Sequence, residues 1–200
     1  MIKNVIFDFG QVIVRFEPAY IVGQFVTDPD DATLLERVMF DRAYWDRLDE
    51  GTLGDEEFLS ACRGQLPVRL HERMETIYWN WIYHIPEIEG MGDLVREVKA
   101  KPGVKAYLLS NISTYFASHS HEFPILGEFD WCLFSALYRL RKPNPAIFEL
   151  LCHRCDIRPE ESIFIDDNED NVQAARSLGI HTYHFDGNVK ALRDYLLTLL

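Results

Sequence analysis

The sequence predicts an α/β fold in which a doubly wound parallel sheet carries an inserted, all-helical segment. Short apolar runs rich in β-branched and aromatic residues recur along the chain, as in strands that are buried on both faces. Such runs lie at residues 5–7, 104–109, 131–134 and 162–165, and a further strand is predicted at residues 180–185. Helical patterns alternate with the later runs, which is typical of a parallel sheet covered by helices on both faces. A long helical stretch, residues 16–86, separates the first run from the rest.

Composition and charge restrict the class of protein. The chain has 200 residues, 48% of them hydrophobic, so it can bury a core and fits one domain with an insertion. A formal net charge of -12 argues against a general affinity for nucleic acid or for anionic membranes. The chain begins directly with a strand, and no apolar run reaches the length of a membrane helix. We therefore expect a soluble cytoplasmic protein.

Four cysteines are too few and too scattered for a secreted disulfide framework. Cys152 and Cys155 match a CxxC pattern, but they lie in a helical stretch and no second pair is present to complete a zinc site. We interpret both as ordinary helix residues.

The inserted segment contains several helices. Asp28 followed by Pro29 predicts a helix N-terminus, because Asp is a favoured N-cap and proline suits the first helical position. Thr52 and Asp55 fit a capping box at the start of a later helix. The clearest helix follows Pro67, where apolar residues recur on one helical face. That face consists of Leu70, Met74, Ile77, Tyr78, Trp81, Ile82 and Ile85.

Capping residues, prolines and glycines also mark the helices after residue 86. The predicted helices cover residues 91–100, a segment starting near Ser113, a segment starting at Asn144 and Pro145, a segment ending at Leu178 before Gly179, and residues 188–200. We therefore predict a core domain of residues 1–15 and 87–200, with the helical segment 16–86 inserted after the first strand.

Polar residues follow three of the predicted strands directly. Asp8 ends the first strand, the pair Ser110 and Asn111 ends the second, and Asp166 with Asp167 follows the strand at 162–165. In parallel sheets the carboxyl ends of the strands meet at one edge, where ligands bind near the reversal of strand order. Lys142, on a loop just before a predicted helix, is placed to reach the same crevice.

Carboxylates gathered at one edge repel one another unless a cation neutralises them. Oxygen ligands suit Mg²⁺, which takes one or two protein carboxylates and uses substrate phosphate for the rest. Asp8 and Asp167 are the natural pair, and the Gly10 carbonyl can supply a third oxygen. Ser110, Asn111 and the amides that follow offer donors to a phosphate, and Lys142 balances the charge. Asp8 can then attack phosphorus and form an aspartyl-phosphate that water hydrolyses.

These residues resemble the four motifs of the haloacid dehalogenase-like (HAD) hydrolases. The matching motifs are Asp8-Phe9-Gly10, Ser110-Asn111, Lys142-Pro143 and Asp166-Asp167-Asn168. The resemblance covers the whole chain, including the helical insertion, and implies a Rossmann-like core with a cap that closes over the substrate and excludes water. It implies that Asp8 is the nucleophile and that Asp8, Gly10 and Asp167 hold Mg²⁺. It also implies phosphate contacts from Ser110, Asn111 and Lys142, Asp166 as a further ligand or a nearby acid, and Asn171 as support for the site.

One position departs from the family pattern. Phosphatases of this family usually carry a second Asp two residues after the nucleophile as general acid and base, and here that position is Gly10. General acid–base catalysis contributes roughly 10² to 10⁴ in rate, which is about 3 to 5 kcal/mol of barrier. A substrate with an acidic leaving group is therefore favoured, such as a sugar 1-phosphate or an acyl phosphate. Asp41, Asp46 or Glu50 of the helical segment are candidates for a replacement acid.

Two other functions remain open at this point. A metal-independent 2-haloacid dehalogenase also lacks the second Asp, but the paired acids Asp166 and Asp167 would oppose an anionic haloacid. A non-catalytic HAD-like binding or regulatory protein is motivated by Gly10 and opposed by the retained nucleophile and lysine. The expected partner of an enzyme is a small phosphorylated metabolite, whose identity, like the oligomeric state, the sequence does not reveal. Candidates for substrate specificity are Arg15, Arg42, Tyr44 and Trp45.

Overall fold

The structure is a computed structural model that describes all residues, 1–200, and it confirms the predicted fold class. Five parallel strands form one sheet in the order β3-β2-β1-β4-β5. The strands are β1 Asn4–Phe7, β2 Lys105–Ser110, β3 Trp131–Phe134, β4 Ser162–Asp166 and β5 His181–His184. From β1 the chain extends the sheet first to one side and then to the other, so the strand order reverses beside β1. Such a reversal opens a crevice at the carboxyl ends of the strands.

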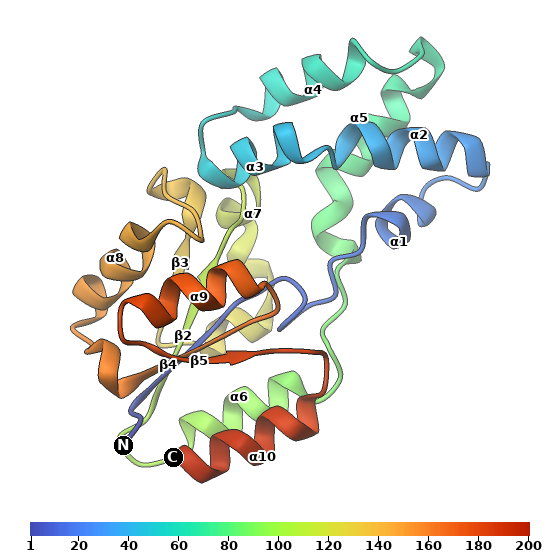
Figure 1. Cartoon of the computed structure of the whole chain (residues 1–200). Coiled ribbons are helices and arrows are strands. Elements are labelled where there is room, and N and C mark those ends of the chain that lie inside the picture. Colours follow the sequence, from blue (N-terminus) through green and yellow to red (C-terminus); the bar gives the residue numbers. More distant parts are fainter.

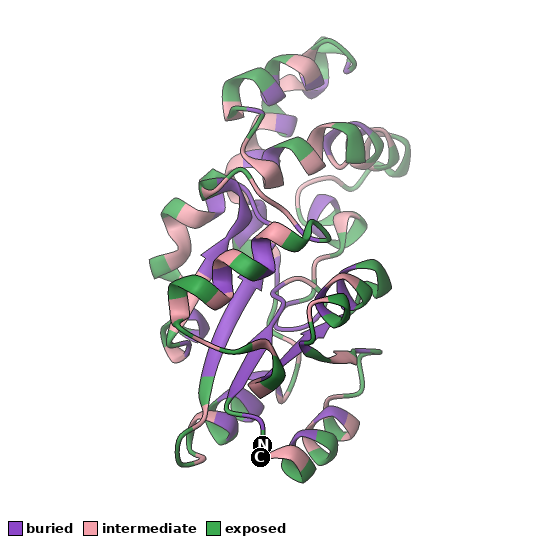
Figure 2. Ribbon diagram, turned by 60° about the vertical axis from the view of Figure 1, so that its left-hand side comes forward, coloured by how far each residue is buried: buried purple, intermediate pink, exposed green.

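Helices cover both faces of the sheet (Figure 1). One face carries α6 (Met91–Lys99) and α10 (Val189–Leu199), and the other carries α8 (Pro145–Cys155) and α9 (Glu169–Ser177). Neighbouring residues of one strand point to opposite faces, so Phe7 belongs to the larger apolar core and Ile6 to the smaller one. The three central strands β1, β2 and β4 are accordingly buried along most of their length (Figure 2), whereas the edge strand β5 has no buried residue. This arrangement explains why the sequences of the central strands are mostly apolar.

The insertion after β1 is entirely helical, and we call residues 16–86 the helical block. It lies beyond the upper, carboxyl end of the sheet in Figure 1. Its elements are α1 Pro18–Gly23, α2 Pro29–Met39, α3 Arg42–Glu50, α4 Asp55–Arg63 and α5 His71–Asn80, with 3-10 turns at Val68–Leu70 and Trp81–His84. Asp28 caps α2 as predicted, because its carboxylate accepts the Asp31 amide at 2.9 Å.

The predicted capping box at Thr52 and Asp55 is wrong. The N-cap of α4 is Gly54, which offers no side chain. Thr52 completes the end of α3 instead, since both its amide and its hydroxyl donate to the Arg47 carbonyl, at 2.9 and 3.4 Å. Gly51 permits this turn because its left-handed φ of 71° suits glycine.

The remaining helices follow their predicted starts. Ser113 caps α7 (Thr114–His119), with a side-chain oxygen that accepts the Phe116 amide at 3.3 Å. Asn144 caps α8 in the same way and Pro145 is its first residue. Short 3-10 turns complete the connections, at Ser120–Glu122, Pro124–Glu128, Ser135–Leu137 and Pro159–Glu161.

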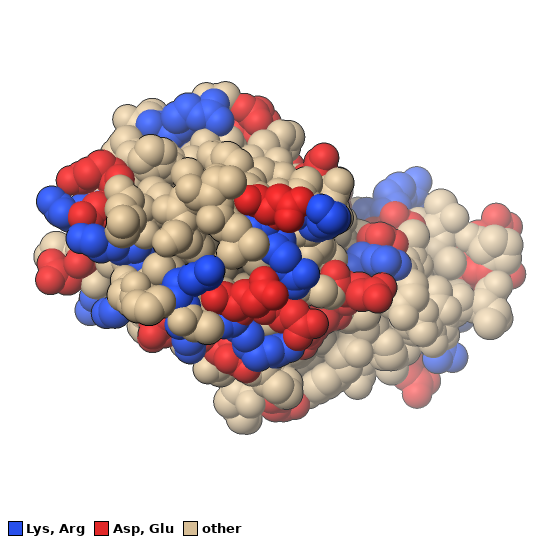
Figure 3. Space-filling view, turned by 90° about the horizontal axis from the view of Figure 1, so that it is seen from below, with Lys and Arg blue, Asp and Glu red and all other residues tan.

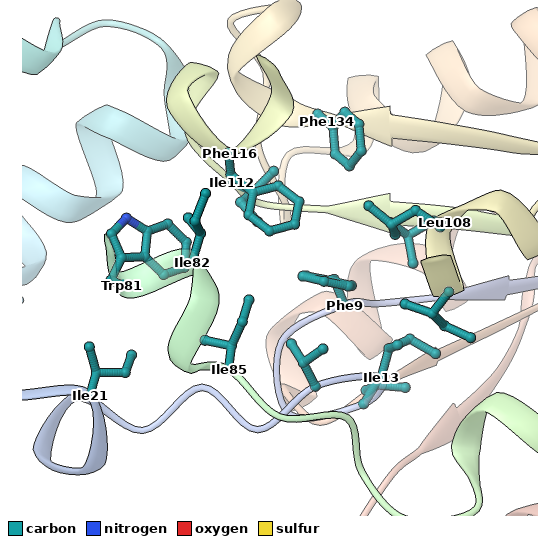
Figure 4. Packing of buried hydrophobic residues seen from close by; sticks show 14 of the residues in the cluster. Phe9, Ile13, Ile21, Trp81, Ile82, Ile85, Leu108, Ile112, Phe116 and Phe134 are labelled. Atoms are coloured by element: carbon teal, nitrogen blue, oxygen red, sulfur yellow. The ribbon is translucent and has the colours of Figure 1, made fainter. Parts of the chain in front are cut away.

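One apolar cluster extends from the sheet into the helical block (Figure 4). Phe9 and Ile13 come from the loop after β1, and Trp81 comes from the end of the helical block. Phe116 of α7 lies between them, with its ring centroid 5.0 Å from that of Phe9 and 6.0 Å from that of Trp81. The helical block is therefore held against the loop that follows β1 by buried aromatic contacts.

The surface carries charges of both signs. On the face seen in Figure 3, Lys and Arg side chains are interspersed with Asp and Glu, so no continuous basic surface forms there. No helix has the length and the apolar composition that a bilayer crossing requires. The four cysteines are free, and Cys152 and Cys155 lie within α8.

Candidate active site

A cavity of about 370 Å³ lies between the carboxyl ends of β1, β2 and β4 and the helical block, and both contribute residues to its lining. A volume of this order suits a small metabolite. The sheet edge contributes Asp8, Gly10, Ser110, Asn111, Asp167 and Asn171 to its lining. Of the predicted site residues, only Lys142 and Asp166 are absent from the lining, because both are buried beneath it.

The loop after β1 fixes Asp8 through its neighbour Phe9. The Phe9 ring is 1% exposed and packs into the apolar core, while Asp8 and Gly10 on either side of it line the cavity. The Phe9 amide donates to Asp8 Oδ1 at 2.7 Å, and the Phe9 carbonyl accepts the amides of Ile13 and Val14 at 2.8 and 3.0 Å. The loop is thus closed by its own hydrogen bonds and anchored by one ring.

Lys142 is buried between two carboxylates. Its Nζ lies 2.6 Å from Asp8 Oδ1 and 2.7 Å from Asp166 Oδ2, and its side chain is 1% exposed. Burial lowers the pKa of this lysine, but the Asp166 and Asp8 carboxylates outweigh that effect and raise it, so the ammonium stays charged. Lys142 therefore contacts the carboxylate of the expected nucleophile, and the predicted contact with substrate phosphate stays a prediction.

Asp166 is fully buried and its carboxylate is saturated by donors. Besides Lys142, it accepts the Asn168 amide at 2.8 Å, and Asn171 Nδ2 lies 3.1 Å from both of its oxygens. Asn171 thereby orients Asp166 from the first turn of α9. The next residue, Asp167, is exposed and faces the cavity.

Three carboxylates converge with one lysine. Oxygen atoms of Asp8, Asp166 and Asp167 lie within 4.8 Å of one another. Burial raises the pKa of the Asp8 carboxyl, Lys142 lowers it and Asp166 raises it further, with a net upward shift. Burial and then Asp166 also raise the pKa of Asp167. A set of hard oxygen donors with surplus negative charge fits a divalent cation such as Mg²⁺.

Ser110 and Asn111 lie where the second motif predicts. Ser110 is 2% exposed and lines the cavity. The Asn111 side chain is engaged with Lys142: its Nδ2 donates to the Lys142 carbonyl at 2.9 Å, and its Oδ1 accepts the Lys142 amide at 2.7 Å. Asn111 thus ties the loop after β2 to the loop before α8. The phosphate contacts predicted for this pair stay predictions.

One face of α3 lines the cavity from the helical block. Arg42, Trp45, Asp46 and Asp49 share this face because they are spaced by three or four residues. Asp46 is ion-paired on both sides, with 3.1 Å from Oδ1 to Arg42 Nε and 2.8 Å from Oδ2 to Arg141 Nη2.

Asp49 and Arg141 are lining residues that the sequence reasoning missed. The helical spacing from Arg42 through Trp45 to Asp49 is the signal that indicates Asp49. Asp41 and Glu50, predicted as replacement acids, do not line the cavity: Asp41 caps α3 by accepting the Ala43 amide at 2.8 Å. Of the specificity candidates, Arg42 and Trp45 line the cavity, whereas Arg15 and Tyr44 do not.

Aromatic side chains form the remaining wall. Phe16, Phe40, Trp45 and Trp81 all line the cavity, and neighbouring ring centroids are separated by 4.7 to 5.9 Å. These four rings form the aromatic wall of the cavity. Arg42, Asp46, Asp49 and Arg141 form its charged wall, and the carboxylates of Asp8 and Asp167 form its floor.

Comparisons with known proteins find similar sequences and a similar fold. A family model described as haloacid dehalogenase-like hydrolase matches residues 2–179. D-ribitol-5-phosphate phosphatase of Bacteroides thetaiotaomicron is 31% identical over 195 residues, which cover 92% of this chain and 91% of that protein. Acyl-CoA dehydrogenase family member 10 of Mus musculus is 28% identical over 202 residues, and the chain spans only 18% of that longer protein. A solved HAD family enzyme of B. thetaiotaomicron, in complex with magnesium and inorganic phosphate, has the same fold, with a TM-score of 0.74 and 22% identity over 94% of this chain and 96% of that one.

Proposed function

The chain belongs to the haloacid dehalogenase-like hydrolases, and on this premise we propose that it is a Mg²⁺-dependent phosphatase of a small phosphorylated metabolite. The match over residues 2–179 confirms the predicted family and the predicted hydrolase activity of phosphatase type. The observation that carries the proposal is the convergence of Asp8, Asp166 and Asp167 around Lys142 on the floor of the cavity.

Asp8, Asp167 and the Gly10 carbonyl are the proposed Mg²⁺ ligands, with Asp166 as a further candidate. When bound, the cation neutralises the carboxylates and polarises the transferring phosphoryl group. Asp166 makes four close contacts with Lys142, Asn168 and Asn171, so its main task in this proposal is to position Lys142.

Asp8 is the proposed nucleophile. One of its oxygens bonds to phosphorus while the bond to the leaving oxygen breaks, which forms an aspartyl-phosphate that water then hydrolyses. Lys142 stabilises the charge that moves between Asp8 and the phosphoryl oxygens. Ser110 and the amides after it are the proposed phosphate donors. The helical block acts as a cap that excludes water from the cavity.

The two walls of the cavity support a hydroxylated organic group, such as a phosphorylated sugar or polyol. Trp45 and Trp81 offer aromatic faces to a C–H surface, while Asp49 and Arg141 on the charged wall can bond hydroxyl groups. The similarity to a D-ribitol-5-phosphate phosphatase agrees with this substrate class. A sugar 1-phosphate is the candidate predicted from the sequence.

Phosphate release from p-nitrophenyl phosphate and from a panel of sugar and polyol phosphates tests the proposal. We expect release that requires Mg²⁺, stops with a chelator and falls by at least roughly 10³-fold in Asp8→Asn. Halide release from a 2-haloacid without metal would instead assign the dehalogenase activity. A folded protein that turns over nothing in the panel, but gains thermal stability from one of its phosphates, would be a binding or regulatory relative.

A further inference from the structure

The cavity lacks an acid in the loop that carries the nucleophile, because Gly10 has no side chain. The ionisable side chains that line the cavity are Asp8, Arg42, Asp46, Asp49, Arg141 and Asp167. Asp8 is the nucleophile and Asp167 a metal ligand in the proposed function, and arginine cannot donate a proton at neutral pH. Asp46 is held in ion pairs with Arg42 and Arg141. Asp49 is the remaining lining residue that can donate a proton.

Asp49 lies on the side where a leaving group emerges. In phosphoryl transfer the attacking and leaving oxygens lie roughly in line with phosphorus. Asp8 attacks from the end of β1, so the leaving oxygen faces the helical block. In Figure 1, helix α3 of that block lies just beyond the carboxyl ends of the strands. Asp49 is the cavity-lining residue closest to the C-terminal end of α3.

The backbone of Asp49 is docked against the core. Its carbonyl accepts a hydrogen bond from Ser135 Oγ, and the same oxygen of Ser135 accepts the Ile112 amide at 2.8 Å. Two residues further on, the Cα of Gly51 packs so closely on the Ala136 carbonyl that a Cβ would lie 2.2 Å from its oxygen. The end of α3 is therefore fixed relative to the loop after β2, which borders the phosphate pocket.

The carboxyl group of Asp49 has no partner within the protein. It accepts no hydrogen bond and forms no ion pair, in contrast to Asp46. Burial raises the pKa of Asp49 to about 7 and the Asp46 carboxylate adds to the shift, while Arg141, Arg42 and Lys142 oppose it. A general acid works best with a pKa near the operating pH.

We propose that Asp49 replaces the acid missing at Gly10 and serves as the general acid and base of the phosphatase, an inference that rests on the proposed function. As the bond from Asp8 to phosphorus forms, the electron pair of the breaking bond stays on the leaving oxygen, which takes the Asp49 proton. The Asp49 carboxylate then takes a proton from water as the water oxygen bonds to phosphorus. The bond from phosphorus to Asp8 breaks with its electron pair on the Asp8 oxygen, which releases inorganic phosphate and regenerates the Asp8 carboxylate and the protonated Asp49.

Asp49→Asn tests the inference through the dependence of kcat/KM on the leaving group. The p-nitrophenolate group leaves without a proton, so p-nitrophenyl phosphate should lose less than about threefold in kcat/KM. An alkyl phosphate needs the proton and should lose roughly 10²- to 10⁴-fold. Substituted phenyl phosphates of decreasing acidity should fall progressively between these limits. Retained turnover of p-nitrophenyl phosphate also shows that the variant is folded.

Two further variants sharpen the test. Glu50→Gln removes a neighbouring carboxylate that does not line the cavity, so both substrates should keep their rates. Gly10→Asp should restore alkyl phosphate turnover in the Asp49→Asn background, because a Cβ at Gly10 would meet only Phe16 Cβ, at 3.9 Å. Such a rescue identifies the lost property as an acid.

Three results would overturn the assignment to Asp49. These are an equal loss for both substrates, no loss for either, and a wild-type protein that hydrolyses p-nitrophenyl phosphate but no alkyl phosphate. In each of them the phosphatase function stands. A wild-type protein that hydrolyses neither ester overturns the proposed function itself.

Discussion

Arg141 and Asp46 form an ion pair in the wall of the cavity, with 2.8 Å between Nη2 and Oδ2. The residue after Arg141 is Lys142, whose Nζ lies 2.6 Å from Oδ1 of Asp8. Two consecutive side chains thus contact carboxylates from the helical block and from the end of β1. The loop before α8 thereby fixes the charged wall of the cavity relative to the expected nucleophile.

Lys142→Met should destabilise the protein by about 3–5 kcal/mol, because it leaves Asp8 and Asp166 buried without a cation. Urea unfolding measures the change. Lys3→Met is the matched control, since Lys3 contacts Glu161 at 2.8 Å with a side chain that is 52% exposed, and its loss should stay below about 1 kcal/mol. Equal losses in the two variants would contradict the structural role of the buried ammonium.

Mg²⁺ should stabilise the folded protein, because it relieves the repulsion among Asp8, Asp166 and Asp167. At 100 times its Kd the gain is about 2.7 kcal/mol, or roughly 5–10 °C in Tm for a chain of this size. Thermal unfolding with and without Mg²⁺ measures the shift. Asp167→Asn should remove most of it, whereas Asp170→Asn, an exposed change in the first turn of α9, should keep it. A full shift in Asp167→Asn would exclude Asp167 as a ligand.

Gly51→Ala should displace the end of α3, because a Cβ would lie 2.2 Å from the Ala136 oxygen and the φ of 71° disfavours alanine. We expect a loss of about 2–4 kcal/mol in unfolding free energy and a lower kcat/KM. Gly103→Ala is the control: it has a φ of 77° but nothing within 4 Å, so it should cost only about 1 kcal/mol and leave kcat/KM unchanged. Identical behaviour of the two variants would show that α3 is not tightly docked.

Asp49→Asn should stabilise the protein at high pH while impairing the enzyme. The pKa of Asp49 rises from 3.8 to about 7 on folding, so its contribution is fully present below pH 4 and is lost as the pH rises through 7. Asparagine does not titrate, so the advantage of the variant should be absent near pH 4 and largest near pH 8. The full shift corresponds to about 4 kcal/mol, and partial exposure reduces this to roughly 1–2 kcal/mol.

Urea unfolding of Asp49→Asn and wild type between pH 4 and pH 8 measures that difference. Glu50→Gln serves as the comparison on the same helix. A stability difference that stays constant with pH would show that the carboxyl of Asp49 is not buried on folding.

Much of the fold could be predicted because its determinants are local. Val5, Ile6 and Phe7 indicate a buried strand without knowledge of their neighbours, and Asp28 or Asn144 caps its own helix. The gathering of Asp8, Ser110 and Asp166 could also be predicted, since parallel strands bring their carboxyl ends to one edge.

The lining of the cavity by α3 could not be predicted, because it depends on tertiary contacts between segments that are distant in the sequence. The orientation of α3 is set by the docking of Gly51 on Ala136 and of the Asp49 carbonyl on Ser135. Helical spacing groups Arg42, Trp45 and Asp49 on one face, but only these contacts turn that face to the cavity, in place of Asp41 and Glu50. Thr52 matches a capping box, yet its hydrogen bonds go to the Arg47 carbonyl at the end of α3. The amide and the hydroxyl of Thr52 therefore complete the end of α3 and do not cap the start of α4.

The hydroxyl of Ser135 joins two segments that are distant in the sequence. It accepts the Ile112 amide in the loop after β2 and donates to the Asp49 carbonyl at the end of α3. The end of α3 and the loop after β2 therefore share one side chain, so a substitution at Ser135 would remove hydrogen bonds from both segments at once.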